Sequence, residues 1–297
     1  MLEIIAYDKT QLDNTAVALG KFEGIHKGHM LLINRIVELA NSIKSVVFTI
    51  NMPDEKVINL DYERYEIFDK CGVDYVCECP FDKRISELSP EEFIKNILVD
   101  RLGVKYVVVG TDFRFGHRRV GDVSTLKEFA DIYGYKVIVF DKLMIDGDIV
   151  SSSAIKKFLD EGAVDKVGEY MGRPYSISGE VSYGKQLGRT IGFPTANLIP
   201  DIRKKLPLSG AYETKVYIES DDKVYKAITN VGNNPTVNDN LADNEGSIVE
   251  THIFDYSEEL YGRYIKVEFI IFIRPEIKFD GLDELKKQLE SDKKSIK

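Results

Sequence analysis

Two histidines, His26 and His29, lie where the sequence changes from a strand pattern to a helix pattern. A short apolar strand is expected over residues 14–20, and a helix with apolar spacing over residues 28–43. Doubly wound sheets bind ligands at the carboxyl ends of their strands, and a helix start offers backbone N–H groups to an anion. Gly28 has no side chain, so a phosphate could approach the backbone closely. The stretch indicates a phosphate-transfer site that stabilises charge on phosphorus and pyrophosphate, and the alternative is a capped helix with two surface histidines.

The run from Gly24 to His29, "GIHKGH", resembles the signature of the HxGH nucleotidyltransferase superfamily. That resemblance implies that both histidines contact ATP phosphates during adenylyl or cytidylyl transfer. The superfamily has a second signature, a Ser/Thr-rich turn that opens a late helix, and "VSSSAIKKF" matches it with Ser152, its two serine neighbours and Lys156. Hydroxyl groups and a cation at a helix start can bind further phosphate oxygens, although three serines alone also fit an ordinary N-cap.

A glycine-rich stretch, "GEVSYGKQLGRTIGFPTANL", covers residues 179–198. Its four glycines permit a flexible flap over a nucleotide, and Lys185 and Arg189 add positive charge. Thr195 and Asn197 are two residues apart and therefore lie on the same side of an extended strand. A hydroxyl and a carboxamide in that position could hold Mg²⁺ and phosphate oxygens. An ordinary glycine-rich hairpin is the alternative.

A strand expected over "SIVETHIFDY" places Glu250 and His252 on one face and Val249 and Thr251 on the other. If the face with Glu250 lies at the mouth of a barrel, its carboxylate could accept a proton from a substrate hydroxyl that attacks ATP. If that face is open to water, Glu250 is a solvated strand carboxylate. The spacing leaves both interpretations open.

The elements that must position these residues change in kind along the chain. The first part alternates strands with helices, and in one helix Ser89 as N-cap, Pro90 and Glu92 form a capping box. Such alternation predicts an α/β domain with a parallel, doubly wound, Rossmann-like sheet. The further strands are expected over residues 45–50, 104–110 and 135–140, and the further helices over 89–103 and 123–134.

The pattern changes near residue 172, after two short helices expected within residues 151–172. Several short strands follow, divided by Gly, Asn and Asp, and they predict an all-β, small antiparallel barrel. An amphipathic helix over residues 281–296 closes the chain. We therefore predict two domains, over residues 1–172 and 173–297.

Composition narrows the class of protein. The 297 residues carry a formal net charge of −9, which argues against nucleic-acid and membrane-surface partners. The N-terminus lacks the pattern of a secretory signal, and no apolar run is long enough to span a bilayer. Cys77 and Cys79 flank one residue in "YVCECP" and read as reduced thiols on a strand rather than zinc ligands. A cytoplasmic enzyme, monomeric or weakly homo-oligomeric, is expected.

The order of these features resembles the bifunctional bacterial riboflavin kinase/FMN adenylyltransferase (FAD synthetase) family over almost the full length. Further matching stretches are "VVVGTDFRFGHRRVGD", "GRPYSISGEV", "ITNVGNNPTV" and "VETHIFDYSEELYGRYIKVEF". The resemblance implies an N-terminal nucleotidyltransferase domain that converts FMN and ATP to FAD and pyrophosphate. It also implies a C-terminal six-stranded barrel that converts riboflavin and ATP to FMN.

The resemblance further assigns roles to single residues. Thr195 and Asn197 match the Mg–ATP ligands of the kinase, and Glu250 matches its general base toward the ribityl 5′-hydroxyl. Asp112 and Arg114 match positions that line the nucleotide and flavin pocket of the adenylyltransferase. The residues expected to serve adenylylation or to bind ATP and its phosphates are His26, His29, Gly24, Gly28, Ser152, Lys156 and Lys185.

The sequence departs from the family pattern in the first domain. "FTINMPDE" stands in place of a Phe-Asp-Pro-His-Pro stretch, Lys21-Phe22-Glu23 in place of Asn-Phe-Asp, and Lys156 in place of an arginine that could bind bidentately. Two alternatives therefore accompany the bifunctional enzyme. One is a riboflavin kinase whose N-terminal domain is weak or inactive, and the other is a non-catalytic flavin- or nucleotide-binding regulatory module.

Overall fold

The computed structural model divides the chain into two compact units, Met1–Ser152 and Ser153–Lys297, called here the N-terminal and the C-terminal unit. The division assigns nearly all of the two helices before residue 172 to the C-terminal unit, and the predicted boundary after residue 172 stays a prediction. The structure describes residues 1–40, 42–51, 56–183, 192–219, 221–233, 247–277, 279 and 281–296.

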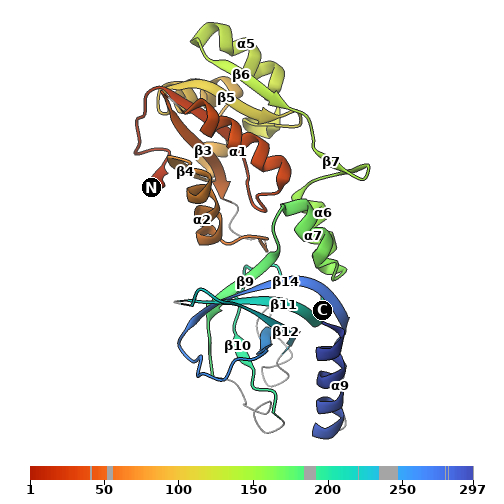
Figure 1. The fold of residues 1–297 in the computed structure, drawn as a ribbon. Helices are drawn as coiled ribbons and strands as arrows, with labels where there is room; N and C mark the ends of the chain where they lie inside the picture. Colours follow the sequence, from red (N-terminus) through yellow and green to blue (C-terminus); the bar gives the residue numbers. More distant parts are fainter. Residues whose placement is uncertain are drawn as a thin grey trace. The chain divides into compact units, whose positions relative to one another are not determined.

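The N-terminal unit is built on six parallel strands in the order β1–β4–β3–β2–β5–β6 (Figure 1). The chain runs outward from β2 through β3 and β4 and then crosses back to β5 on the other side of β2. The strand order therefore reverses between β2 and β5, which confirms the predicted doubly wound sheet. The strands are β1 (Glu3–Ala6), β2 (Thr15–Gly20), β3 (Lys44–Asn51), β4 (Tyr75–Pro80), β5 (Val104–Gly110) and β6 (Lys136–Phe140).

Helices cover both faces of this sheet because its strands are apolar on both sides. On one face, α1 (Lys27–Leu39) and α2 (Asp61–Cys71) contribute Ile33 and Phe68 to a core that includes Val108. On the other face, Phe93 and Leu126 pack in a second core with Val107. Val107 and Val108 are both fully buried, as a strand covered from both sides requires. The remaining helices of the unit are α3 (Lys83–Ser86), α4 (Pro90–Glu92), η1 (Phe93–Val99), η2 (His117–Arg119) and α5 (Val123–Tyr133).

The helix predicted over residues 89–103 begins as expected but changes character. The Ser89 hydroxyl accepts the Glu92 N–H at 3.2 Å and the Glu92 carboxylate accepts the Ser89 N–H at 2.8 Å, so the capping box is confirmed. After Glu92 the helix continues as a π-helix over Phe93–Val99 and ends there. The helix predicted over 28–43 also ends early, at Leu39, because β3 already begins at Lys44.

Cys77 and Cys79 lie buried on β4, as the apolar pattern of "YVCECP" predicts. Burial raises the pKa of each thiol to about 12. A thiol with so high a pKa is almost entirely protonated at neutral pH and is a poor nucleophile. These cysteines therefore contribute packing to the sheet.

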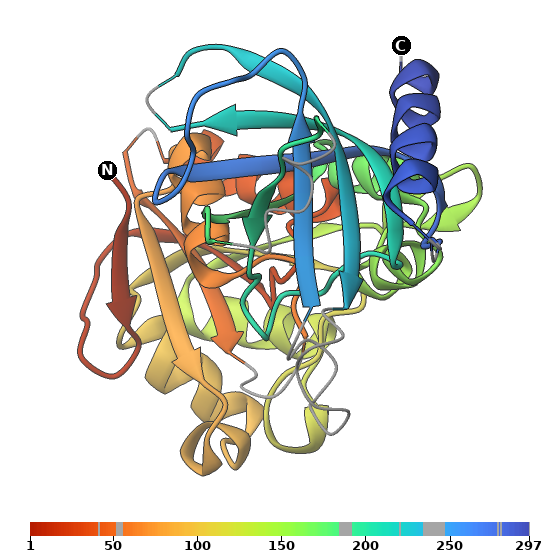
Figure 2. The same ribbon diagram turned by 90° about the horizontal axis from the view of Figure 1, so that it is seen from below.

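The C-terminal unit carries six strands that pair antiparallel throughout, in the order β10–β13–β12–β11–β14–β9. The sheet curls on itself, as the green-to-blue strands of Figure 2 show. Ser182 donates its backbone N–H to the Asn197 carbonyl at 2.8 Å, which joins the segment after β9 to β10. This contact confirms the predicted barrel-like closure. The strands are β9 (Tyr175–Glu180), β10 (Ala196–Leu198), β11 (Gly210–Ile218), β12 (Val224–Asn233), β13 (Ser247–Ile253) and β14 (Tyr264–Pro275).

Among the residues that the structure describes, the helices that accompany this sheet are α6 (Ser152–Asp160), α7 (Val164–Met171) and the predicted C-terminal helix, α9 (Leu282–Ser295). The Arg274 guanidinium binds the Asp292 carboxylate, with Nη2 at 2.8 Å and Nε at 3.0 Å from Oδ2. Asp292 is only 3% exposed, and Gln288 donates a further hydrogen bond to it at 2.7 Å. The ion pair therefore fixes the last turns of α9 against β14.

Candidate active sites

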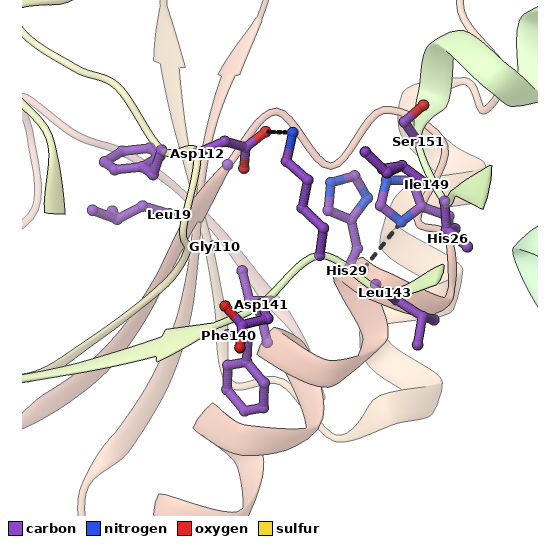
Figure 3. Close-up of a pocket in the computed structure, with 16 residues that line it drawn as sticks. Leu19, His26, His29, Gly110, Asp112, Phe140, Asp141, Leu143, Ile149 and Ser151 are labelled. Carbon is purple, nitrogen blue, oxygen red and sulfur yellow. Dashed lines mark hydrogen bonds and ion pairs between the residues drawn. The ribbon is translucent and has the colours of Figure 1, made fainter. Parts of the chain in front are cut away.

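A cavity of about 200 Å³ opens where the strand order of the N-terminal unit reverses. Gly20 ends β2 and Gly110 ends β5, and both line it, so the cavity lies at the carboxyl ends of the two central strands. This is the position that doubly wound sheets use for ligands. Figure 3 shows side chains from several loops around it, and the lining residues are Leu19, Gly20, His26, Gly28, His29, Leu32, Gly110, Asp112, Phe113, Phe140, Asp141, Lys142, Leu143, Ile149, Val150 and Ser151.

The two predicted histidines lie side by side in this cavity. Their rings stack with centroids 3.7 Å apart and planes 15° from parallel. His26 is the N-cap of α1, and its Nδ1 accepts the His29 backbone N–H at 3.2 Å. Because Nδ1 acts as acceptor, a neutral His26 ring carries its proton on Nε2. His26 can therefore present Nε2–H as a donor to a phosphate oxygen.

Gly28 has a packing role beyond the one expected from its sequence position. A Cβ atom at residue 28 would lie 3.2 Å from both Cε1 and Nδ1 of His26, a distance that forces the ring to move. Gly28 therefore makes room for the imidazole that caps the helix.

The loop before the histidines is held in an uncommon conformation. Phe22 and Ile25 are fully buried yet have φ values of 47° and 41°, in the left-handed region that favours glycine. The Phe22 ring lies 5.0 Å from the ring of His29, so the strained loop packs directly against the histidine pair. Such strain persists only where the surrounding contacts fix the backbone.

The residues that depart from the family pattern take part in fixing this loop. The Glu23 carboxylate accepts the backbone N–H of Ile58 at 3.1 Å, and the Asn59 amide donates to the Glu23 carbonyl at 3.2 Å. The Thr49 hydroxyl donates to the Lys21 carbonyl at 2.9 Å. The glutamate at position 23 thus ties the loop to the segment that precedes α2. Of the departure "FTINMPDE", residues 48–51 belong to β3 and residues 52–55 lie outside the described residues.

The remaining residues predicted for this site are only partly brought together. Asp112 lines the cavity and pairs with Lys142 at 3.0 Å, whereas Arg114 is exposed, is not among the lining residues and donates to the neighbouring Phe113 carbonyl. Gly24 is buried in the loop and does not line the cavity either.

The serine-rich turn contributes Ser151 to the cavity lining, and Ser152 begins α6. Lys156 belongs to the C-terminal unit, so its role in this site stays a prediction. Sequence reasoning missed Asp141 and Lys142, although they follow the predicted strand over 135–140. The rule that drew attention to the end of the first strand, applied to this strand as well, would have found them.

The C-terminal unit places the predicted kinase residues on adjoining strands. The register pairs Asn197 of β10 with Glu250 of β13, and Glu250 with Asn230 of β12. Paired residues on neighbouring strands project from the same face, so the three polar side chains form one row across the sheet. Val249 and Thr251 on the other face are fully buried, whereas Glu250 is half-buried. Glu250 is therefore not a fully solvated strand carboxylate.

Within this row, the side-chain oxygen of Asn197 is buried without a hydrogen-bond donor among the described residues, which indicates a ligand-binding position. The residue is 3% exposed, and among the residues that the structure describes no group donates a hydrogen bond to its Oδ1. A buried carbonyl oxygen without a donor costs about 1–3 kcal/mol, so native proteins rarely leave one. A cation at Oδ1 would remove this cost, and amide and hydroxyl oxygens are ligands that Mg²⁺ accepts.

Thr195 lines a larger cavity of about 890 Å³ in the C-terminal unit, together with His252 and Tyr261. His252 Nδ1 lies 2.8 Å from the Pro194 carbonyl, so the imidazole links β13 to the residue before Thr195. The pKa of His252 is lowered, mainly because the imidazole is buried. The hydrogen bond to the Pro194 carbonyl raises this pKa in part, and the positive charge of Lys293 lowers it slightly. His252 was not assigned a role from the sequence, although it shares a strand face with Glu250. The predicted Lys185 lies outside the described residues.

In comparison with known proteins, two different family models match the two parts of the chain that hold these two sites. A family model described as FAD synthetase matches residues 8–154, and one described as riboflavin kinase matches residues 171–297. Two curated bifunctional riboflavin kinase/FMN adenylyltransferases are 33% identical to the chain. The match to the Haemophilus influenzae protein covers 96% of this chain and 94% of the relative. The match to the Escherichia coli protein covers 94% of this chain and 91% of the relative. The Listeria monocytogenes relative of the same name is 31% identical and covers 96% and 92%.

A solved structure described as a macrolide-efflux protein from Streptococcus pneumoniae has the same fold. The TM-score is 0.86 at 28% sequence identity, over 98% of this chain and 97% of the other. In the described part of this chain, no helix has both the length and the apolar character needed to cross a membrane.

Proposed function

We propose, because the chain belongs to the family of bifunctional riboflavin kinase/FMN adenylyltransferases, that its two reactions take place at the two sites described above. The protein is an ATP-dependent transferase that phosphorylates riboflavin to FMN and adenylylates FMN to FAD, with release of pyrophosphate. The kinase reaction belongs to the C-terminal barrel and the adenylyl transfer to the parallel sheet. The finer assignment to residues is supported by the geometry of each site.

In the kinase reaction, the 5′-hydroxyl oxygen of riboflavin attacks the γ-phosphorus of ATP and the bond to ADP breaks. Glu250 accepts the hydroxyl proton, as the aspartate of other kinases does. The observation that carries this assignment is the pairing of Glu250 with Asn197, whose buried Oδ1 has no donor among the described residues. The carboxylate that accepts the hydroxyl proton and the amide oxygen that would bind the magnesium ion of Mg–ATP thus occupy paired positions on neighbouring strands.

The residues present fit a magnesium ion at this site. Thr195 and Asn197 would hold it through a hydroxyl and a carboxamide oxygen, and the phosphates of ATP would supply further ligands. When bound, Mg²⁺ neutralises charge on the phosphate oxygens. The described residues contain no group of three or more His, Cys, Asp or Glu side chains that could hold a metal ion.

In the adenylyl transfer, a phosphate oxygen of FMN attacks the α-phosphorus of ATP and pyrophosphate leaves. His26 and His29 stabilise the negative charge that builds on phosphorus and on the departing oxygens, because their rings are fixed by stacking and by the helix cap. The start of α1 adds backbone N–H groups and the positive end of its dipole. Ser151 and Asp112 line the same cavity, whereas the predicted residues Gly24 and Arg114 do not and the predicted Ser152 begins α6.

Incubation of the purified protein with riboflavin, Mg²⁺ and ATP, followed by chromatographic separation of the flavins, tests the assignment. FMN followed by FAD supports both activities. FMN alone supports a kinase with a weak or inactive N-terminal unit, and unchanged riboflavin that nevertheless binds supports a regulatory module. We also infer a cytoplasmic location from the buried thiols of Cys77 and Cys79, since exported proteins usually pair their cysteines in disulfides.

A further inference from the structure

Lys142 is the feature of the first cavity that neither the sequence pattern nor the reaction scheme above uses. It lies in the loop between β6 and the short hairpin of β7 (Met144–Ile145) and β8 (Asp148–Ile149). The same loop contributes Asp141 and Leu143 to the cavity lining. Among the described residues that line the cavity, Lys142 is the only lysine or arginine.

The charges around Lys142 make its position informative. Its Nζ lies 3.0 Å from Oδ2 of Asp112, the ion pair marked by the dashed line from Asp112 in Figure 3. Asp112 and Asp141 are both in the lining, so without a cation the cavity would present two carboxylates to an incoming triphosphate. Like charges at close range disfavour binding, although water weakens the repulsion where the side chains are exposed. A positive charge among these lining residues would therefore favour a phosphate ligand at this site.

The exposure of the pair shows that the lysine can exchange partners. The side chains of Lys142 and Asp112 are 43% and 65% exposed, so their attraction is weakened by water and costs little to break. A nucleotide phosphate carries more negative charge than one carboxylate and accepts hydrogen bonds from an ammonium group at several oxygens. A flexible lysine stem allows Nζ to move from Asp112 to such an oxygen without a change of the backbone.

We propose that Lys142 is a phosphate-binding residue of the adenylyltransferase site, held beside the histidine pair by Asp112 until the ATP phosphates replace that carboxylate as its partner. This inference rests on the proposed function of the first cavity. It gives that cavity a cation from its own loop, separate from Lys156 in the C-terminal unit.

The test is the steady-state kinetics of FAD synthesis from FMN and ATP by the full-length protein. For Lys142→Met we expect the KM for ATP to rise about tenfold or more, as the loss of one charge-assisted contact implies. Lys142→Arg, which keeps the charge, should stay within about threefold of the wild-type KM. Lys105→Met is the matched control. Lys105 is exposed near the amino end of β5, whereas the cavity lies at the carboxyl ends of the central strands.

A double variant separates a phosphate contact from simple neutralisation of Asp112. If Lys142 only cancels the charge of Asp112, then Asp112→Asn combined with Lys142→Met should bring the KM for ATP back to the wild-type value at saturating FMN. If Lys142 binds phosphate, the double variant should keep a KM at least severalfold above wild type. Restoration in the double variant, or an unchanged KM in Lys142→Met, would overturn the proposal.

Failure of this inference can be told from failure of the proposed function. A wild-type protein that makes no FAD contradicts the proposed adenylyl transfer. A wild-type protein that makes FAD, loses it in His29→Ala and keeps its KM for ATP in Lys142→Met contradicts only the role of the lysine. The conversion of riboflavin to FMN should be unchanged in Lys142→Met, because that reaction is assigned to the other unit.

Discussion

The two sites of this protein are built in different ways. The histidine site is local in sequence: a helix cap, a stacked pair three residues apart and a glycine that makes room for the ring. The Asn197–Glu250 site is assembled by strand register, from residues that are far apart along the chain. The first is therefore a property of one loop and one helix, and the second exists only when the sheet is paired correctly. Single substitutions should separate them cleanly.

The largest effect is expected for Glu250→Gln. Loss of a general base should reduce FMN formation between about a hundredfold and ten-thousandfold, while FMN-to-FAD conversion stays at the wild-type rate. Chromatography of flavins with riboflavin or FMN as the starting substrate measures both. Glu213→Gln on β11, a half-buried strand glutamate outside the polar row, is the control. A folded Glu250→Gln protein that loses both activities would break the separation of the two sites.

His29→Ala should produce the opposite pattern. Removal of one stabilising donor should slow FAD synthesis by about a hundredfold or more and leave FMN formation intact. His117→Ala, which removes an exposed histidine of the same unit, is the matched control. FAD synthesis at the wild-type rate in His29→Ala would refute the role of the stacked pair.

Gly28→Ala sharpens the comparison within the first site. The added Cβ would meet the His26 ring at 3.2 Å, so the ring must shift although both histidines remain. We expect kcat/KM for FAD synthesis to fall about tenfold, because small displacements of a positioned group are costly to catalysis. Gly168→Ala in α7, where the nearest atom lies at 3.7 Å, should have no such effect. Equal rates in the two variants would show that the ring position is not critical.

The smallest expected effect is a pH dependence of folding stability that arises from His252 in the C-terminal unit. The pKa of His252 is lowered in the folded protein from about 6.5, so the unfolded chain binds the proton more readily. The stability that neutral His252 contributes is present above about pH 6.5 and is lost as pH falls through the lowered pKa.

His252→Asn keeps a donor for the Pro194 carbonyl but cannot titrate in this range. Its thermal unfolding should therefore respond less to a change from pH 7.5 to pH 5.5 than that of wild type. His117→Asn should behave like wild type. A pH response in His252→Asn as large as that of wild type would remove His252 as its source.

The contrast between local and assembled sites also explains what the sequence could predict. Strands such as β5, covered on both faces, and capped helices were predicted because their signals lie within a few residues. The helix α2 was missed because its buried positions include the polar Glu63 and Arg64, so no apolar stripe marks it. The π-helical geometry of η1 has no signal in residue type.

The sites follow the same rule. His26 and His29 could be found from their spacing, whereas the pairing of Glu250 with Asn197 depends on register that no single segment specifies. Lys142 was missed because the rule that drew attention to the end of the first strand was not applied to the end of β6, where Lys142 lines the same cavity.

The left-handed backbone at Phe22 and Ile25 has a consequence for how the first site meets its ligand. A loop locked by buried rings and by the Glu23 contacts has already lost its conformational entropy when the protein folds. Capture of a nucleotide then requires little reordering, and association should proceed at a rate set by diffusion and charge. A site of this kind selects its ligand by shape complementarity, because its conformation is already formed before the nucleotide binds.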